Sequence, residues 1–135
     1  IYMNNIYIFN TSNFKIRNNE IKKVIGDILK KQNIDLKIEV NVSFVDDLAM
    51  TRLHKKYLRE DGTTDVLSFP IDELKSNKSS KIRFTNPDKI TRLGDIVVSF
   101  PQAVKQAGEL GVTVSEEINK LVEHGLLHLL GIHHE

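Results

Sequence analysis

Apolar residues recur along this 135-residue chain with two different periods. Residues 2–9 are rich in β-branched and aromatic side chains, which favours a strand. A spacing of three and four residues then predicts a helix, capped by Asn18 or Asn19, with one buried face made of Ile21, Val24, Ile25, Ile28 and Leu29. From Leu36 to Val45 the period becomes two, which predicts a strand with one buried face.

The middle of the chain continues this alternation of helix and strand. A helix begins at Asp46 or Asp47 and ends near Leu58, and we expect His54 on this helix to face solvent. Its apolar stripe is Met50, Leu53 and Tyr57. After a turn, residues 66–69 form a short strand. Pro70 follows directly. Because proline has no N–H to donate within a sheet, either the strand lies at the edge of the sheet or the proline lies at the end of the strand.

Two helices are predicted at the C-terminal end, after a polar stretch over residues 72–92 and a strand over residues 93–99. A serine cap and Pro101 begin the first helix, and Gly111 ends it. The second begins with the capping-box spacing of a threonine and a glutamate and runs to about Leu130. Strands and helices therefore mix around a sheet, which indicates the α+β or α/β class and one domain over residues 1–135.

Composition limits the possible functions. With 40% hydrophobic and 27% charged residues the chain matches a folded globular domain, and it has no apolar run that could span a membrane. Its formal net charge of +1 is far from that of a dedicated nucleic-acid binder. The chain has no cysteine, so any soft-metal site must use histidine. The N-terminus does not resemble a signal peptide, and we expect a cytoplasmic protein.

One polar stretch is locally basic and contains Lys75, Lys78, Lys81, Arg83, Lys89 and Arg92. This stretch is either a solvated loop or an arm that faces phosphates.

Four of the five histidines lie in the last twelve residues of the chain. His124 and His128 are four apart, so on a helix they share one face and can direct their imidazoles to one cation. Gly131 can end the helix and let the chain turn, so that His134 returns over the pair as a third ligand, with His133 as its competitor. Three imidazoles with an open fourth position are typical of a catalytic zinc, so we predict one zinc ion per chain.

A peptidase and a structural metal site are the alternatives to this interpretation. The spacing of the three histidines is that of a metzincin protease, but Gly125 occupies the position of the glutamate general base. Peptide hydrolysis by that route is therefore not expected, whereas hydrolysis of an ester remains open. A structural zinc would need a fourth protein ligand, for which Glu135 or His133 is available.

Three motifs together resemble those of the YbeY family of bacterial endoribonucleases: residues 124–131 with a third histidine at 134, residues 64–70 (TDVLSFP) and residues 93–97 (LGDIV). The resemblance covers the chain from about Val40 to Glu135. It implies an α+β fold with helices around a small mixed sheet and a zinc site on His124, His128 and His134. It also implies single-stranded ribosomal RNA as the substrate, in 16S maturation and ribosome quality control. The expected partners are ribosomal RNA and the small ribosomal subunit, with neither DNA nor a membrane.

The chain departs from the family pattern at a catalytic position. Members often have Tyr-Arg before the TDVLSFP motif, whereas here Leu58 separates Tyr57 from Arg59. We predict that Arg59 grips a phosphate as the catalytic cation, the alternative being an exposed arginine that only complements the helix dipole. Members usually continue past the third histidine, so we expect more chain after Glu135.

Three other polar residues have two possible roles. Asp65 and Asp95 either orient the ligand imidazoles or cap turns. Ser68 either contacts substrate or satisfies a backbone group.

Overall fold

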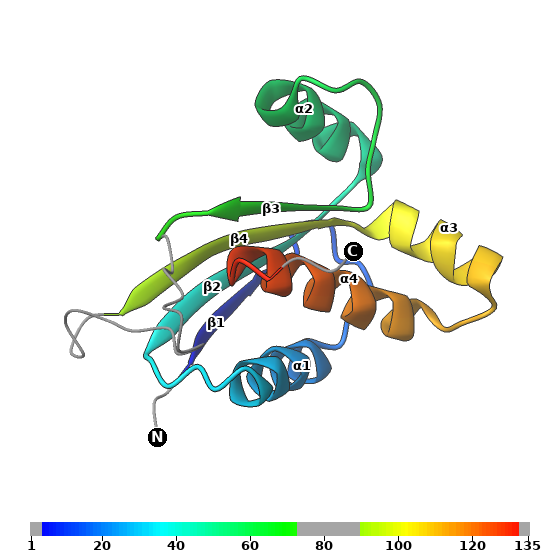
Figure 1. Cartoon of the computed structure of the whole chain (residues 1–135). Helices are drawn as coiled ribbons and strands as arrows, with labels where there is room; N and C mark the ends of the chain where they lie inside the picture. Colours follow the sequence, from blue (N-terminus) through cyan, green and yellow to red (C-terminus); the bar gives the residue numbers. More distant parts are fainter. Residues whose placement is uncertain (1–3, 73–89, 133–135) are drawn as a thin grey trace.

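The computed structural model describes residues 4–72 and 90–132. Figure 1 shows strands and helices arranged around one sheet. In chain order the elements are β1 (Asn5–Phe9), α1 (Asn18–Lys31), β2 (Ile38–Val45), α2 (Asp47–Leu58), β3 (Val66–Pro70), β4 (Thr91–Ser99), α3 (Phe100–Leu110) and α4 (Val114–Leu129). Each predicted element is present, and its bounds differ from the prediction by a few residues at most.

The strands form one mixed sheet in the order β1-β2-β4-β3. β1 pairs with β2 and β2 pairs with β4 in parallel, whereas β3 runs antiparallel to β4. β3 is therefore an edge strand, and Pro70 is its last residue, as the missing N–H of proline predicts. A mixed sheet covered by helices confirms the α+β class.

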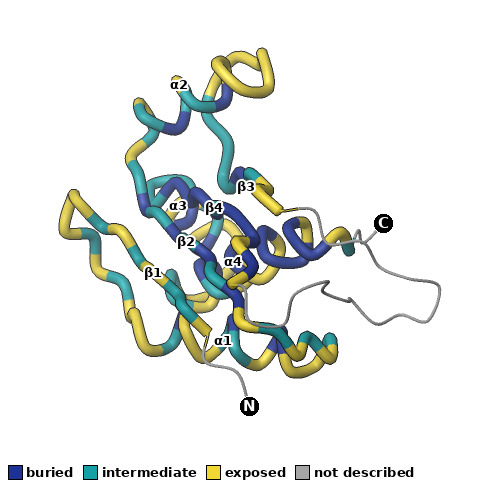
Figure 2. Tube along the Cα trace, turned by 90° about the vertical axis from the view of Figure 1, so that its left-hand side faces the viewer, coloured by how far each residue is buried: buried dark blue, intermediate teal, exposed yellow. Residues whose placement is uncertain are grey.

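The main hydrophobic core lies between one face of the sheet and the helices α1 and α4. Alternate residues of β2 point to this face and are fully or almost fully buried, namely Ile38, Val40, Val42 and Phe44. Figure 2 shows that the buried part of the trace is concentrated in β2, β4 and α4. The period-two pattern of β2 and the helical stripe of α1 therefore meet in one core.

Helix α2 lies on the other side of the sheet and packs there through a smaller cluster of Met50, Leu67 and Val97. The carboxylate of Asp47, in the first turn of α2, fastens the helix to its surroundings. It accepts hydrogen bonds from the hydroxyl groups of Ser99 (2.9 Å) and Thr63 (3.0 Å) and from the amide of Gln102 (3.2 Å).

The pKa of Asp47 is lower than that of an ordinary aspartate. Desolvation of the carboxylate raises its pKa, but the hydrogen bonds from Ser99, Gln102 and Thr63, together with the positive charge of Lys105, outweigh this effect. The ionised carboxylate therefore holds α2 against the start of α3.

Two local expectations are wrong. His54 is buried, with 8% of its surface exposed, because its Nδ1 bonds the carbonyl oxygen of Gly62 (3.1 Å) and its Nε2 contacts the carboxylate of Glu60 (2.9 Å). The N-cap of α1 is Arg17, which makes no side-chain cap, so neither predicted asparagine caps this helix. The burial of His54 depends on the loop after α2, and the cap of α1 depends on the segment before that helix. Helical periodicity specifies neither of these segments.

The basic stretch lies largely outside the described residues. Arg92 is described: it belongs to β4, and its guanidinium lies 3.5 Å from the carboxylate of Glu39. The prediction of a phosphate-facing arm concerns mainly residues 73–89, outside the described ranges.

Among the helices in the described ranges, none is both long enough and apolar enough to cross a bilayer.

Candidate active site

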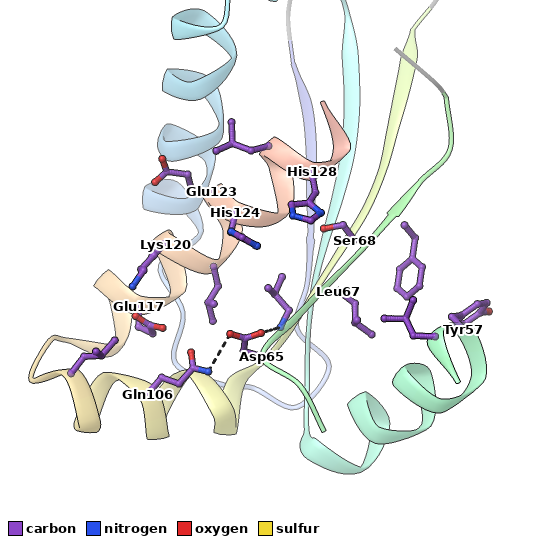
Figure 3. Close-up of a pocket in the computed structure, with 16 residues that line it drawn as sticks. Tyr57, Asp65, Leu67, Ser68, Gln106, Glu117, Lys120, Glu123, His124 and His128 are labelled. Atoms are coloured by element: carbon purple, nitrogen blue, oxygen red, sulfur yellow. Dashed lines mark hydrogen bonds between the residues drawn. The ribbon is translucent and has the colours of Figure 1, made fainter. Parts of the chain in front are cut away.

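The histidine pair lies near the C-terminal end of α4. The capping box at its start is formed as predicted: the Glu116 N–H donates to the Thr113 hydroxyl (3.1 Å), and the Thr113 N–H donates to the Glu116 carboxylate (3.0 Å). From this start, His124 and His128 fall one turn apart on the same exposed face. Their ring centroids are 4.8 Å apart and their planes differ by 39°. The imidazoles lie side by side, as their spacing predicts (Figure 3).

Gly131 ends this helix in the predicted left-handed conformation, with a φ of 75°. The N–H of Ile132 then donates to the carbonyl oxygen of Leu127 (2.9 Å), and the N–H of Gly131 donates to that of His128 (3.0 Å). The chain therefore turns away from the helix axis directly after the pair. His134 and its competitor His133 lie outside the described residues, as does Glu135.

The described histidines fit part of a metal site. Within residues 4–72 and 90–132, no three His, Cys, Asp or Glu side chains are grouped so that they could hold a metal ion. The chain does place two neighbouring imidazoles on an exposed helix face, and imidazole nitrogen is a preferred ligand of zinc. The described donors therefore suit zinc as two ligands of three, and His134 as the third remains a prediction.

Close packing of α4 on the sheet explains the glycine at position 125, next to His124. It is buried, and a Cβ atom there would lie 2.7 Å from Cγ2 of Ile96 and 3.2 Å from the hydroxyl oxygen of Ser68. The position thus faces the sheet at a point where helix and strand touch. Gly125 leaves no carboxylate at this position to act as a general base, so peptide hydrolysis by the metzincin route remains unexpected.

A cavity of about 880 Å³ lies beside the histidine pair, along the free edge of β3 (Figure 3). Helices α3 and α4 form one wall and the end of α2 forms the other. The lining residues are Tyr57, Leu58, Asp65, Val66, Leu67, Ser68, Phe69, Gln106, Leu110, Glu117, Lys120, Leu121, Glu123, His124, Leu127 and His128. We call this cavity the cleft.

One end of the cleft is rich in hydrogen-bond acceptors. The carboxylate of Asp65 accepts from the amide of Gln106 (3.1 Å) and from the N–H of Val66 (2.7 Å). Glu117 lies at the same end of the cleft and is only 3% exposed (Figure 3). None of the hydrogen bonds or ion pairs found among the described residues involves the Glu117 carboxylate, although it reaches the cleft.

The two cations near the cleft differ in position. Lys120 lines the cleft and is exposed at its mouth. Arg59 follows Leu58, which lines the cleft, but is not itself a lining residue. It is exposed and caps α2 in the left-handed conformation (φ 55°), and its N–H donates to the carbonyl oxygen of Lys55 (3.0 Å). The structure thus places Arg59 next to the cleft rather than inside it.

Ser68 takes one of its two predicted roles, whereas Asp95, inside β4, neither caps a turn nor orients an imidazole. Asp95 accepts a hydrogen bond from Asn41 (2.9 Å) and lines a separate cavity of about 350 Å³ under α2. Because its neighbour Ile96 touches Gly125 of α4, Asp95 points to the opposite face and does not orient His124. The hydroxyl of Ser68 donates to the carbonyl oxygen of Gly125 (3.2 Å), which satisfies a backbone group, and Ser68 also lines the cleft.

Sequence reasoning missed Glu117 and Lys120. Both lie on the cleft side of α4, seven and four residues before His124. Residues four and seven positions before His124 share its face of the helix. Helical periodicity could therefore have predicted that both residues lie beside the histidine pair.

Comparison with known proteins identifies the family. A profile described as Endoribonuclease YbeY matches residues 7–135. The chain belongs to the YbeY family. The family is one of endoribonucleases, which are nucleases and hence hydrolases.

Individual YbeY relatives and a solved structure agree with this assignment. An Endoribonuclease YbeY of Persephonella marina is 42% identical over 115 residues, covering 85% of this chain and 68% of the relative. A Dehalococcoides mccartyi protein of the same name (strain BAV1) is 40% identical over 118 residues, covering 85% and 74%. The solution structure of TM1509 from Thermotoga maritima is similar with a TM-score of 0.60 and 28% identity, covering 98% of this YbeY chain and 75% of that one.

Proposed function

We propose that this protein is a cytoplasmic, metal-dependent endoribonuclease that cuts single-stranded ribosomal RNA in 16S maturation and ribosome quality control. One zinc ion per chain would be held by His124, His128 and His134. Its partners are ribosomal RNA and the small ribosomal subunit. The observation that carries the proposal is the exposed pair of imidazoles, 4.8 Å apart, at the side of a cleft in a YbeY-family chain.

The shape of the cleft supports a single-stranded substrate. It is an open cavity along a sheet edge, and the rings of Tyr57 and Phe69 meet edge to face at its α2 side, with centroids 5.1 Å apart. Phe69 is half-buried, and the exposed ring of Tyr57 can stack with an unpaired base, which a duplex keeps in its interior. Leu121 and Leu127 are buried apolar residues that line the cleft beside the histidines.

The chemistry divides among groups of the chain. The imidazoles of His124 and His128 would hold the zinc ion, which would supply Lewis-acid stabilisation of phosphate oxygens or a more acidic water molecule. The ammonium group of Lys120 stabilises phosphate charge from the mouth of the cleft. The guanidinium of Arg59 stabilises phosphate charge from the end of α2, where it can reach an RNA strand that extends past Leu58.

The test combines metal content with cleavage. Untagged protein is analysed for zinc by atomic emission and is then incubated in parallel with single-stranded RNA and with casein, with and without a chelator. We expect about one zinc per chain, chelator-sensitive cleavage of RNA and intact casein. Cleavage of RNA that persists at zero metal content would contradict metal dependence, and RNA that stays intact at full zinc content would favour a structural metal site.

A further inference from the structure

Glu117 is a buried carboxylate that the proposed chemistry leaves without a role. It lines the cleft with 3% of its surface exposed, and it has no hydrogen-bond or ion-pair partner among the described residues. Its carboxylate oxygens are not among the fully buried atoms without a partner, so they open into the cleft, where a bound group can donate hydrogen bonds to them. The residue therefore points to a ligand that brings hydrogen-bond donors into the cleft.

The position of Glu117 separates it from the reacting phosphate. Seven residues, or about two helical turns, lie between Glu117 and His124, which corresponds to roughly 10.5 Å along the axis. Both residues line the same cleft. A group bound at Glu117 is therefore a neighbouring part of the substrate that occupies the histidine end.

The surroundings of Glu117 favour an organic donor over a metal ion. No group of three metal-binding side chains occurs within the ranges that the structure describes. The Gln106 amide donates an N–H to the carboxylate of Asp65, and its side-chain carbonyl oxygen is a further acceptor. Leu110 and Leu121 provide apolar walls at this end of the cleft. Such a site suits a flat ring whose edge carries N–H groups.

We propose that Glu117 binds a guanine base of the RNA strand in the cleft and makes the enzyme prefer guanine at one position near the cut. The inference rests on the proposed function, because it assumes that RNA fills the cleft. Guanine is the base that presents two adjacent donors, N1–H and the 2-amino group, to one carboxylate. Adenine and cytosine place a ring acceptor beside their amino group, and uracil flanks its N–H with two carbonyl oxygens. A pair of carboxylate acceptors therefore disfavours all three relative to guanine.

The decisive experiment pairs a protein change with a substrate change. A single-stranded RNA that the protein cleaves is resynthesised with inosine, which lacks the 2-amino group, in place of each guanine in turn. At one position we expect inosine to lower kcat/KM by about tenfold to a hundredfold, the effect of losing a hydrogen bond to a charged group. Glu117→Gln should cause a similar loss with guanine, and inosine should cost the variant nothing further. Losses that simply multiply would overturn the inference.

Glu109→Gln is the matched control, because Glu109 is an exposed residue of α3 that does not line the cleft. It should keep the full response to inosine. The circular dichroism spectrum and thermal unfolding of Glu117→Gln show whether it folds. If it does not, the inosine series with the unaltered protein still decides, since equal cleavage at every substituted position contradicts a guanine subsite.

A binding measurement distinguishes this inference from the proposed function. Calorimetry with the zinc-loaded chain compares guanosine, inosine and adenosine monophosphates. We expect guanosine monophosphate to bind about tenfold more tightly than the other two, and Glu117→Gln to abolish that difference. Protein that cleaves no RNA but keeps this preference would refute the nuclease proposal alone. Cleavage of RNA with equal affinities for the three nucleotides would refute the guanine subsite alone.

Discussion

Ser68 and Gly125 join the edge strand to the metal helix: the serine hydroxyl donates to the glycine carbonyl at 3.2 Å, and the missing glycine Cβ leaves room for that hydroxyl and for Ile96. The histidine face of α4 is thereby fixed at the distance from β3 that leaves the cleft between them. A change at Gly125 should therefore alter both stability and the site.

Gly125→Ala should lower the free energy of unfolding by about 1 to 3 kcal/mol, because the new methyl group would lie 2.7 Å from a methyl group of Ile96. Urea unfolding measures the difference. Gly108→Ala is the matched control: Gly108 is also helical, and a Cβ there meets nothing within 4 Å. It should raise stability by about 0.5 to 1 kcal/mol, since alanine is the better helix former. Equal effects of the two changes would contradict the close packing.

His128→Ala should abolish stoichiometric zinc binding. Removal of one imidazole from a three-histidine site leaves too few ligands to hold the ion tightly. Zinc content after dialysis is the measurement, and His54→Ala is the control, because His54 lies in α2 and bonds Gly62 and Glu60. The control should lose stability but keep its zinc. A His128→Ala protein with full zinc content would remove the basis of the proposed metal site.

The fold was largely predictable because its signals are local. The capping box of α4, the proline that ends β3 and the glycine that ends α4 each act through neighbours in the sequence. The burial of His54 and the outward face of Asp95 were not predictable. The burial of His54 depends on the loop after α2. The direction of Asp95 depends on which side of β4 meets α4, and the sequence does not show this because β4 has apolar residues on both faces. Glu117 was missed because its burial depends on how α3 packs on α4.

Asp47→Asn should destabilise the protein by about 1 kcal/mol at neutral pH, since its ionised carboxylate accepts hydrogen bonds from three side chains. The pKa of Asp47 in the folded state lies below its ordinary value of 3.8. Its contribution is therefore fully present above that value and is lost as the pH falls through the lower folded pKa. Urea titrations at several pH values should show the two proteins converging below pH 3.8. A constant difference down to pH 2, about two units lower, would show that the charge is not the cause.

Arg59, at the end of α2, is the proposed cation for the phosphate. A guanidinium can bind a phosphate through two parallel hydrogen bonds, which an ammonium group cannot reproduce. If Arg59 stabilises the transition state, Arg59→Lys should keep the fold and zinc content while lowering RNA cleavage by on the order of a hundredfold.

Lys120→Gln provides the comparison, because Lys120 lines the cleft and Arg59 lies just beyond its lining. We expect the Lys120 change to weaken cleavage less, because an exposed ammonium group at the mouth is screened by water and salt. Initial cleavage rates at fixed RNA concentration and low salt rank the two variants. Unchanged cleavage in Arg59→Lys together with a large loss in Lys120→Gln would show that Lys120 of α4, and not Arg59, stabilises the phosphate charge. Arg59 would then be a helix cap whose exposed side chain complements the dipole of α2.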